Sequence, residues 1–387
     1  MEKTKIATLL ETVKAVILCV ILVTVIVGSV IMTTTFLLTV VSTSGNTGSG
    51  DTASMADMAI MDRYDMYMTN QVSSALDGVL AIEKVYWLSD DDMVAPEPNQ
   101  DLFGSTDDPS TLGWLLEDAQ KLLDGQETVF KLDTPIGPNT SVQYYLDDTI
   151  LAITWKQPMG NTMYTISEVK IAHPSQLRRF LSGGAYGSPI QLTTSEMATS
   201  VNAVVASSGD FYAFRRHGVI VYDGVVQRCD PNHVDTCYFN DQGDMIFSRR
   251  RELPTIKDAQ AFVDENNIRF RVAFGPILVD NGEELKIPDY LLGEIYDRYC
   301  RAAICQMGPL HYLVMVAATE GSYVTTPHLF EFQDHIMTFK PDKAYTLDGG
   351  QTGVIVMNDK VVNKLYYGSQ RNISDIIYFA TAIPDGE

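Results

Sequence analysis

Positive charge is scarce in this sequence. The 387 residues include 28 Lys and Arg against 49 Asp and Glu, which gives a formal net charge of −21. So acidic a chain argues against a general nucleic-acid-binding protein, whose surface should be basic. The arginines are also unevenly placed, since Arg63 is the only one before Arg178. The second half therefore sets arginines in an acidic background, a pattern that suits recognition of phosphate or carboxylate groups.

The sequence lacks several signatures of known chemistry. It has no H-E-x-x-H, no C-x-x-C, no G-x-S-x-G and no P-loop, so nothing indicates a zinc protease, a nucleophile-elbow hydrolase or a nucleotide-binding loop. No internal repeat is present either. We predict no cofactor and assign no metal ligands, while the need for a divalent metal is left open.

Charge is almost absent from residues 13–41, and this apolar run exceeds the roughly 20 residues that a membrane-spanning helix needs. Lysines precede the run, and no Lys or Arg follows until Arg63, so the positive-inside rule keeps residues 1–12 in the cytoplasm. A cleavable signal peptide usually has a shorter apolar core. We predict an uncleaved single-pass anchor, a flexible linker over 42–54, and a main domain outside the cell membrane.

Cysteine is rare, with five in the chain. Cys229 and Cys237 bracket a turn-rich stretch between two strand-like segments, and we predict a disulfide between them in an oxidising exterior. Cys300 and Cys305 are five positions apart in a strand-like segment, so their side chains face opposite sides of it. They are predicted to be core residues without a disulfide bond.

Helical periodicity dominates the region that follows the linker. Residues 55–138 are predicted to form a helical, membrane-proximal stalk, with Ser110 capping a helix over 111–124. Pro174 is expected to begin another short helix, and residues 255–266 and 326–339 also have helical patterns.

Short β-type runs separated by Gly, Asp and Asn turns fill most of residues 139–387. The expected fold class is α+β, with a twisted, mixed or antiparallel sheet and flanking helices.

Charged residues adjoin glycine at several predicted strand ends. The stretches "SGDFY", "RAAICQ", "LDGG" and "RNISD" carry Asp210, Arg301, Asp348, Arg371 and Asp375. Together they offer carboxylates, bidentate anion-binding groups and glycines that allow a ligand close to the backbone. Each stretch alone is a common structural turn, but their combination indicates a site.

The order of these stretches resembles the phosphodiester glycosidase family over about residues 201–383. The sequence departs from the family pattern at four positions: Ser208 replaces an Asn, Cys305 and Gln351 replace glycines, and Gly353 replaces a serine. The carboxylate and arginine positions are retained.

The resemblance implies hydrolysis of a bond between a sugar's anomeric carbon and a phosphodiester. An oxocarbenium-like transition state needs a carboxylate, and the leaving phosphate needs arginine. It therefore implies Asp210 and Asp348 for acid–base or nucleophilic work, Asp375 for positioning an arginine, and Arg301 and Arg371 for the phosphate. The other residues assigned to substrate binding are Gly209, Gln306, His311, Gly349 and Gly350.

Two functions are weighed from these features. The first is an extracytoplasmic hydrolase acting on sugar-1-phosphodiesters in cell-envelope or exopolysaccharide glycopolymers. The alternative is a non-catalytic scaffold that binds anionic glycans. Turnover of a sugar-phosphodiester distinguishes them.

Overall fold

Antiparallel sheets dominate the structure, a computed structural model that describes residues 88, 94–222, 224–287 and 294–382. Every strand ladder within these ranges is antiparallel, and the helices are few and short. The predicted α+β class is confirmed for this part of the chain. The anchor predicted over 13–41 and the stalk helix predicted before residue 88 lie outside the described residues. Within those ranges, no helix is both long and apolar enough to span a membrane.

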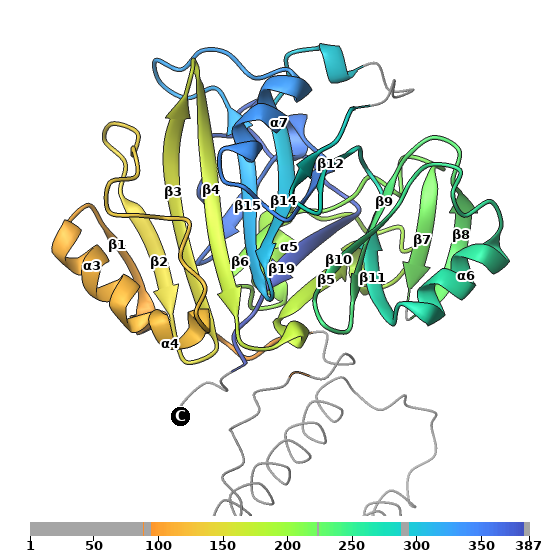
Figure 1. The fold of residues 1–387 in the computed structure, drawn as a ribbon, viewed down its shortest axis with the longest axis horizontal. Helices are drawn as coiled ribbons and strands as arrows, with labels where there is room; N and C mark the ends of the chain where they lie inside the picture. Colours follow the sequence, from red (N-terminus) through yellow and green to blue (C-terminus); the bar gives the residue numbers. More distant parts are fainter. Residues whose placement is uncertain (1–87, 89–93, 223, 288–293, 383–387) are drawn as a thin grey trace, which may run out of the picture. The chain divides into compact units, whose positions relative to one another are not determined.

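The larger sheet has nine strands (Figure 1). Its middle strands are apolar on both faces: Tyr312, Val314 and Val316 contribute to one core cluster, while Leu313 and Met315 contribute to another. Two buried faces explain why this stretch of sequence has no polar alternation. In spatial order the strands are β1 (Phe103–Thr106), β2 (Val142–Leu146), β3 (Ile150–Met159), β4 (Thr162–Ile171), β15 (His311–Ala318), β14 (Arg301–Gly308), β16 (Lys343–Leu347), β12 (Ile277–Asp280) and β13 (Glu283–Glu284).

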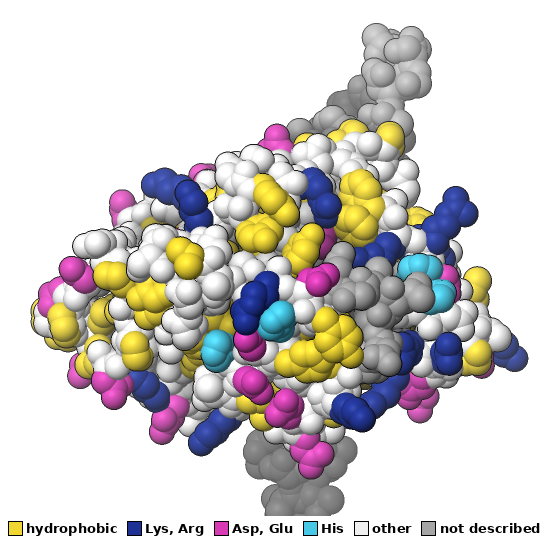
Figure 2. Space-filling view, turned by 90° about the horizontal axis from the view of Figure 1, so that it is seen from above, with side chains coloured by type: hydrophobic (Ala, Val, Ile, Leu, Met, Phe, Trp, Pro, Cys, Tyr) yellow, Lys and Arg dark blue, Asp and Glu magenta, His cyan; other side chains and the backbone are white. Residues whose placement is uncertain are grey.

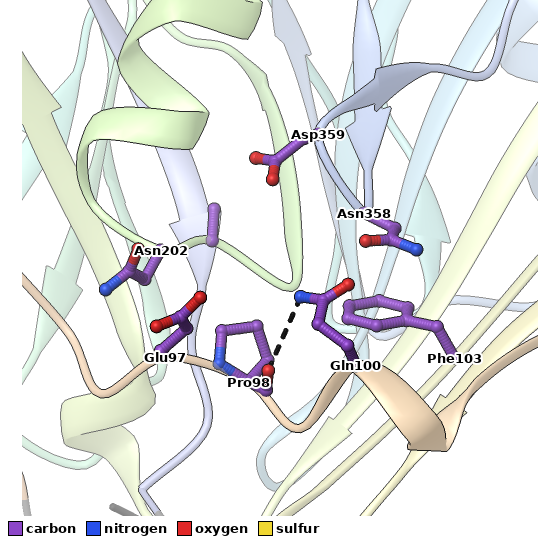
Figure 3. A pocket seen from close by; sticks show the side chains of 8 residues that line it. Glu97, Pro98, Gln100, Phe103, Asn202, Asn358 and Asp359 are labelled. Carbon is purple, nitrogen blue, oxygen red and sulfur yellow. Dashed lines mark hydrogen bonds between the residues drawn. The ribbon is translucent and has the colours of Figure 1, made fainter. Parts of the chain in front are cut away.

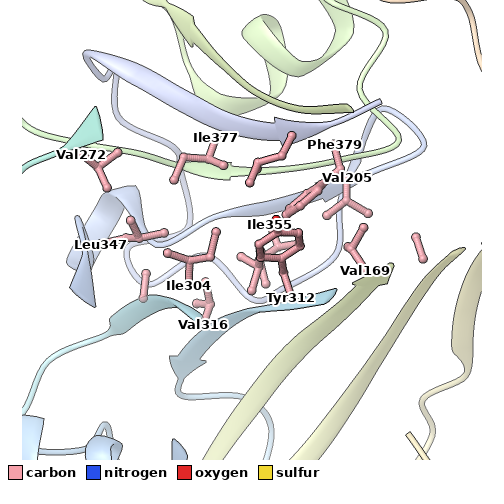
Figure 4. Packing of buried hydrophobic residues seen from close by; sticks show 14 of the residues in the cluster. Val169, Val205, Val272, Ile304, Tyr312, Val316, Leu347, Ile355, Ile377 and Phe379 are labelled. Carbon is pink, nitrogen blue, oxygen red and sulfur yellow. The ribbon is translucent and has the colours of Figure 1, made fainter. Parts of the chain in front are cut away.

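A five-stranded sheet packs on one face of the larger sheet. Between them Ile304 and Tyr312 of the larger sheet meet Ile355, Ile377 and Phe379 of the smaller one (Figure 4). Burial of these apolar side chains is the main stabilising contribution at this interface. The five strands are, in spatial order, β18 (Lys360–Val361), β17 (Ile355–Met357), β6 (Val205–Ser208), β19 (Asp375–Phe379) and β5 (Leu177–Leu181).

Helices cover the outer faces of both sheets. Leu115 of α3 (Pro109–Asp118) and Phe332 of α7 (Leu329–Met337) are buried with Trp155 on the larger sheet. Met197 of α5 (Thr194–Ser200) is buried with Ile376 on the smaller sheet. The remaining single-turn elements are α4 (Gln120–Leu123), η1 (Gln100–Leu102), η2 (Pro174–Gln176), η3 (Ser182–Gly184), η4 (Glu294–Tyr296) and η5 (Gly350–Thr352).

Two small sheets form the other side of the fold in Figure 1. They share a separate core with the helix α6, in which Tyr238, Val263 and Val219 are buried. Their strands are β7 (Gly218–Tyr222) with β8 (Val225–Asp230), and β10 (Met245–Ser248), β9 (Thr236–Asn240) and β11 (Ile268–Val272); α6 spans Ile256–Glu265.

The predicted disulfide is not formed, because Cys229 and Cys237 are both free thiols. Cys237 faces the main core, whereas the neighbouring Tyr238 faces the cluster against which Cys229 packs. Alternation along β9 therefore turns the Cys237 side chain away from Cys229. Cys300 and Cys305 are buried and free, as predicted.

Three predicted element boundaries differ from the structure. The helix near residue 111 begins earlier, because the Asp108 side chain accepts the Ser110 amide and Asp108 is the cap. Pro174 begins only a 3₁₀ turn, after which the chain continues as β5. β1 pairs with β2, so the sheet begins before the boundary that we placed at residue 139.

Candidate functional site

The ends of four strands, two from each large sheet, meet at one place. The pairing of Ser208 with Ile376 brings the end of β6 to the start of β19, and the pairing of Ala302 with Leu347 brings the end of β16 to the start of β14. Across the two sheets, the Asp348 amide donates to the Gly209 carbonyl at 3.2 Å. The Ser208 hydroxyl donates to the Asp348 carbonyl at 3.0 Å. Four of the predicted stretches are therefore neighbours in space.

Asp348 and Arg371 form an ion pair at this junction. Nη2 of Arg371 lies 3.2 Å from Oδ2 of Asp348, and their side chains are 40% and 9% exposed respectively. Arg301 stands opposite Asp348 in the strand register, because Ala302 pairs with Leu347, and residues so placed have Cα atoms about 5 Å apart. One carboxylate thus has two guanidinium-bearing residues beside it, with Arg371 open to solvent.

Asp375 and Asp210 are buried, and each binds an arginine. Asp375 accepts from Nε of Arg179, and Asp210 accepts from Nη1 of Arg271. The two acids are also linked, since Oδ1 of Asp375 accepts the Asp210 amide at 2.6 Å. Burial, reinforced by the nearby Arg179, lowers the pKa of Arg271 well below its usual value. Buried ion pairs such as these fix geometry more than they add stability.

Arg179 and Arg271 were not predicted as site residues. Arg179 lies in the stretch that we interpreted as a helix begun by Pro174, but it belongs to β5. Arg271 lies on β11 between Phe270 and Val272. A charged residue inside an apolar strand is a detectable signal, because an unpaired buried charge is costly.

The glycines of the site accommodate the protein's own backbone and side chains. A Cβ atom on Gly209 would lie 2.6 Å from Oδ1 of Asp375, and one on Gly349 would lie 2.4 Å from the Cys300 carbonyl oxygen. Gly350 has a φ of +60° and donates its amide to the same carbonyl at 2.8 Å. The close approach predicted for a ligand is thus made by Asp375 and Cys300.

Gln306 and His311 lie away from this junction. Gln306 is five residues from Arg301 along β14, a separation of roughly 17 Å. Its amide group binds Asp244 and the backbone of Met245, and His311 binds the buried Glu168 at 2.7 Å. We therefore withdraw both from the candidate site, because both are buried and already bonded within the fold.

Aromatic side chains surround the arginines. The ring of Phe211 contacts two guanidinium groups, lying 4.9 Å from that of Arg371 and 5.1 Å from that of Arg215. Phe214 stacks on Phe211 with ring centroids 4.8 Å apart and is about half exposed. Stacking of this kind orients a guanidinium without neutralising its charge.

Three tyrosines form a second aromatic group on the Arg301 side. Tyr299 lies 5.9 Å from the Arg301 guanidinium and 6.0 Å from Tyr366, which contacts Tyr367 at 4.5 Å. Tyr367 is 63% exposed. The group provides an apolar surface with hydroxyl groups beside the charged residues.

A separate small pocket lies at the other end of the smaller sheet (Figure 3). It is lined by Glu97, Gln100, Asn202 and Asn358, among others. Asn202 precedes β6 and Asn358 follows β17, whereas the junction lies at the opposite ends of these strands. The lining has no Lys or Arg, so this pocket does not suit a phosphate group.

The face of the molecule in Figure 2 shows no extended patch of side chains with one sign of charge. Basic, acidic, histidine and hydrophobic side chains are exposed together on this face. The net charge of −21 is therefore compatible with local binding of an anion by arginine.

Comparison with known proteins gives one family match. The family model described as phosphodiester glycosidase matches residues 201–380, which contain the junction. None of the curated proteins matches the chain.

Two of the solved structures to which the chain is similar share 13% sequence identity with it. One, from Synechocystis, is a hypothetical protein: the match covers 64% of each chain with a TM-score of 0.49, so it spans less than two thirds of that protein. The other is the zebrafish N-acetylglucosamine-1-phosphodiester alpha-N-acetylglucosaminidase catalytic domain, auto-inhibited by its pro-peptide; 76% of this chain and 99% of that one are covered, with a TM-score of 0.48.

Proposed function

Because residues 201–380 form a domain of the phosphodiester glycosidase family, we propose that the protein hydrolyses sugar-1-phosphodiesters at the Asp348–Arg371 junction. The observation that carries this assignment is the carboxylate of Asp348, placed 3.2 Å from an arginine that solvent reaches. It puts a group that can stabilise a cationic sugar next to a group that can bind the departing phosphate.

In the proposed reaction, a water molecule attacks the anomeric carbon and the bond from C1 to the phosphate oxygen breaks. The bonding electron pair leaves with the phosphate, which departs as a phosphomonoester, and the attacking water gives up a proton. Asp348 stabilises the positive charge on the sugar or accepts that proton. Arg371 binds the phosphate oxygens, whose charge grows as the bond breaks. Arg301 is 7% exposed and donates to the Asp297 carbonyl, and its positive charge beside Asp348 favours the same anion.

Asp210 and Asp375 act as positioning residues in this proposal. Their carboxylates are almost fully buried and bonded to Arg271 and Arg179, so substrate does not contact them in the described fold. They hold the Gly209–Phe211 turn, whose backbone binds Asp348 and whose aromatic ring orients Arg371.

We extend the proposal to glycopolymers of the cell envelope. Tyr366 and Tyr367 extend an aromatic surface beyond Arg301, which suits further sugar units. The apolar run over 13–41 supports an anchored protein whose catalytic domain faces outward.

The test is hydrolysis by the full-length chain purified in detergent, with a panel of alkyl diesters of sugar-1-phosphates. Release of free sugar and phosphomonoester, lost in Asp348→Asn, supports the proposal. Saturable binding of the same diesters without turnover would favour the non-catalytic glycan-binding alternative.

A further inference from the structure

Two histidines and an aspartate meet at the edge of the β7–β8 hairpin. His217 directly precedes β7, Asp230 ends β8, and His233 follows in the turn to β9. One potential ligand atom from each residue lies within 4.8 Å of the others. The register of β7 and β8 explains why these side chains are close, because Gly218 pairs with Asp230 and so places His217 beside that carboxylate.

The geometry of the three groups suits a small divalent ion. Nδ1 of His217 is 3.2 Å from Oδ2 of Asp230, and the two imidazole rings have centroids 4.2 Å apart. Ligand atoms around a tetrahedral zinc ion are about 3.3 Å apart for bonds of 2.0–2.1 Å. The His217–Asp230 pair already has that spacing, and the third potential ligand atom, from His233, lies within 4.8 Å of the other two.

The backbone that carries these ligands is held independently of any ion. Nη2 of Arg228 donates to the carbonyl groups of His217 and Arg215 at 3.3 and 2.9 Å. The Pro231 carbonyl accepts the Arg251 amide at 2.7 Å. Such anchoring lowers the entropic cost of gathering the ligands, which favours metal affinity.

We propose that His217, Asp230 and His233 bind a transition-metal ion of the Zn²⁺ class, which ties the 211–217 segment to the β8–β9 turn. The ion takes the place of the hydrogen bond between His217 and Asp230, and its remaining position is taken by water. Three mixed nitrogen and oxygen ligands select such an ion over Ca²⁺ and Mg²⁺, which prefer oxygen alone.

The metal site is close in sequence to the catalytic junction but distinct from it. Phe211 and Arg215, whose side chains stack at the junction, lie on the segment that His217 ends. A Cβ on Gly218 would lie 2.6 Å from Cβ of Ala273, whose amide donates to Asp210. Metal binding therefore orders a segment that contacts the junction without supplying a group to the reaction.

The experiment uses the full-length chain and Co²⁺ and Zn²⁺ as probes. We expect one Co²⁺ per chain with an intense visible absorption band typical of tetrahedral coordination, displaced by Zn²⁺, and slower protease cleavage within 211–217. His233→Gln should weaken Zn²⁺ binding more than about 100-fold, because losing even a residue that only hydrogen-bonds to a metal ligand typically lowers metal affinity 10- to 100-fold. His328→Gln, a change at a half-buried histidine of another element, is the matched control.

Absence of stoichiometric Co²⁺ binding overturns the proposal. So does Zn²⁺ binding that His233→Gln and Asp230→Asn leave unchanged. These readouts do not depend on turnover, so they are separate from the test of the hydrolase. A melting temperature equal to that of the parent chain in the presence of a chelator shows that the variants are folded.

Discussion

Arg371 places its Nη2 atom 3.2 Å from Oδ2 of Asp348, although the two residues lie on different segments of the chain. The arginine is partly exposed and the aspartate is nearly buried, so the pair lies where solvent meets the ends of both sheets. Its exposure distinguishes it from the Arg271–Asp210 and Arg179–Asp375 pairs, which are buried.

Removing the Arg371 guanidinium should weaken turnover. Arg371→Ala is expected to lower kcat/KM on a sugar-1-phosphodiester by about 10²- to 10³-fold, the usual effect of losing a donor to a developing anion. Arg371→Lys should recover part of this loss, because it restores the charge without the bidentate geometry. Steady-state kinetics measures both variants.

Arg298→Ala is the matched control for that series. Arg298 forms an exposed ion pair with Glu331, which typically contributes about 0–1 kcal/mol. Its loss should leave kcat/KM unchanged. Equal losses in Arg298→Ala and Arg371→Ala would remove Arg371 from the phosphate site.

The buried Asp210–Arg271 pair should behave non-additively. Asp210→Asn leaves an uncompensated buried guanidinium and should lower the free energy of unfolding by about 3–5 kcal/mol. Arg271→Met leaves the opposite charge and should be similarly destabilising. The double variant should be less destabilised than the sum of the two, as measured by urea unfolding at pH 7. Additive losses would contradict a direct interaction.

Gly209 should not tolerate a side chain. A Cβ at this position would lie 2.6 Å from Oδ1 of Asp375, so Gly209→Ala should destabilise the fold by about 1–3 kcal/mol and reduce activity. Gly113→Ala is the control, because its Cβ meets no atom within 4 Å and it lies inside α3. That change should stabilise the protein by roughly 0.5–1 kcal/mol, and thermal unfolding compares the two.

His335 should make stability depend on pH. Burial lowers its pKa, despite the opposing effects of Asp334 and Glu331, and its Nδ1 shares a hydrogen bond with the Tyr164 hydroxyl. The unfolded chain therefore binds this proton at a higher pH than the folded chain does. The stabilisation that neutral His335 contributes to the folded state is present above pH 6.5. It is lost as the pH falls below 6.5 through the lowered pKa of the folded state. His335→Gln should flatten the melting temperature between pH 7 and 5 relative to the parent chain.

Strand content was predictable because β-branched and aromatic residues cluster between Gly, Asp and Asn turns. The ordered stretches "SGDFY", "RAAICQ", "LDGG" and "RNISD" also indicated a common site, since residues at strand ends gather at sheet edges. The helix α6 was recognised from its periodicity, because the capping Thr255 and the apolar Ala259 and Val263 are local features.

The features that could not be predicted depend on pairing between distant strands. Gln306 and His311 share a hairpin with Arg301, but only the length of β14 shows that they lie far from it. The partners of Asp210 and Asp375 come from β11 and β5, and no local pattern specifies that choice. The disulfide was mispredicted for a related reason, because the register of β9 decides to which side of the sheet the Cys237 side chain points.

The hydrogen bonds that join Ser208 and Gly209 to Asp348 have a mechanical consequence. They connect the ends of two sheets whose apolar interface is otherwise non-directional. A small displacement of one sheet over the other would misalign Asp348 with Arg371 while water remained excluded from most of the apolar core. We therefore expect denaturant to lower the catalytic activity at concentrations where spectroscopic signals of folding are still unchanged.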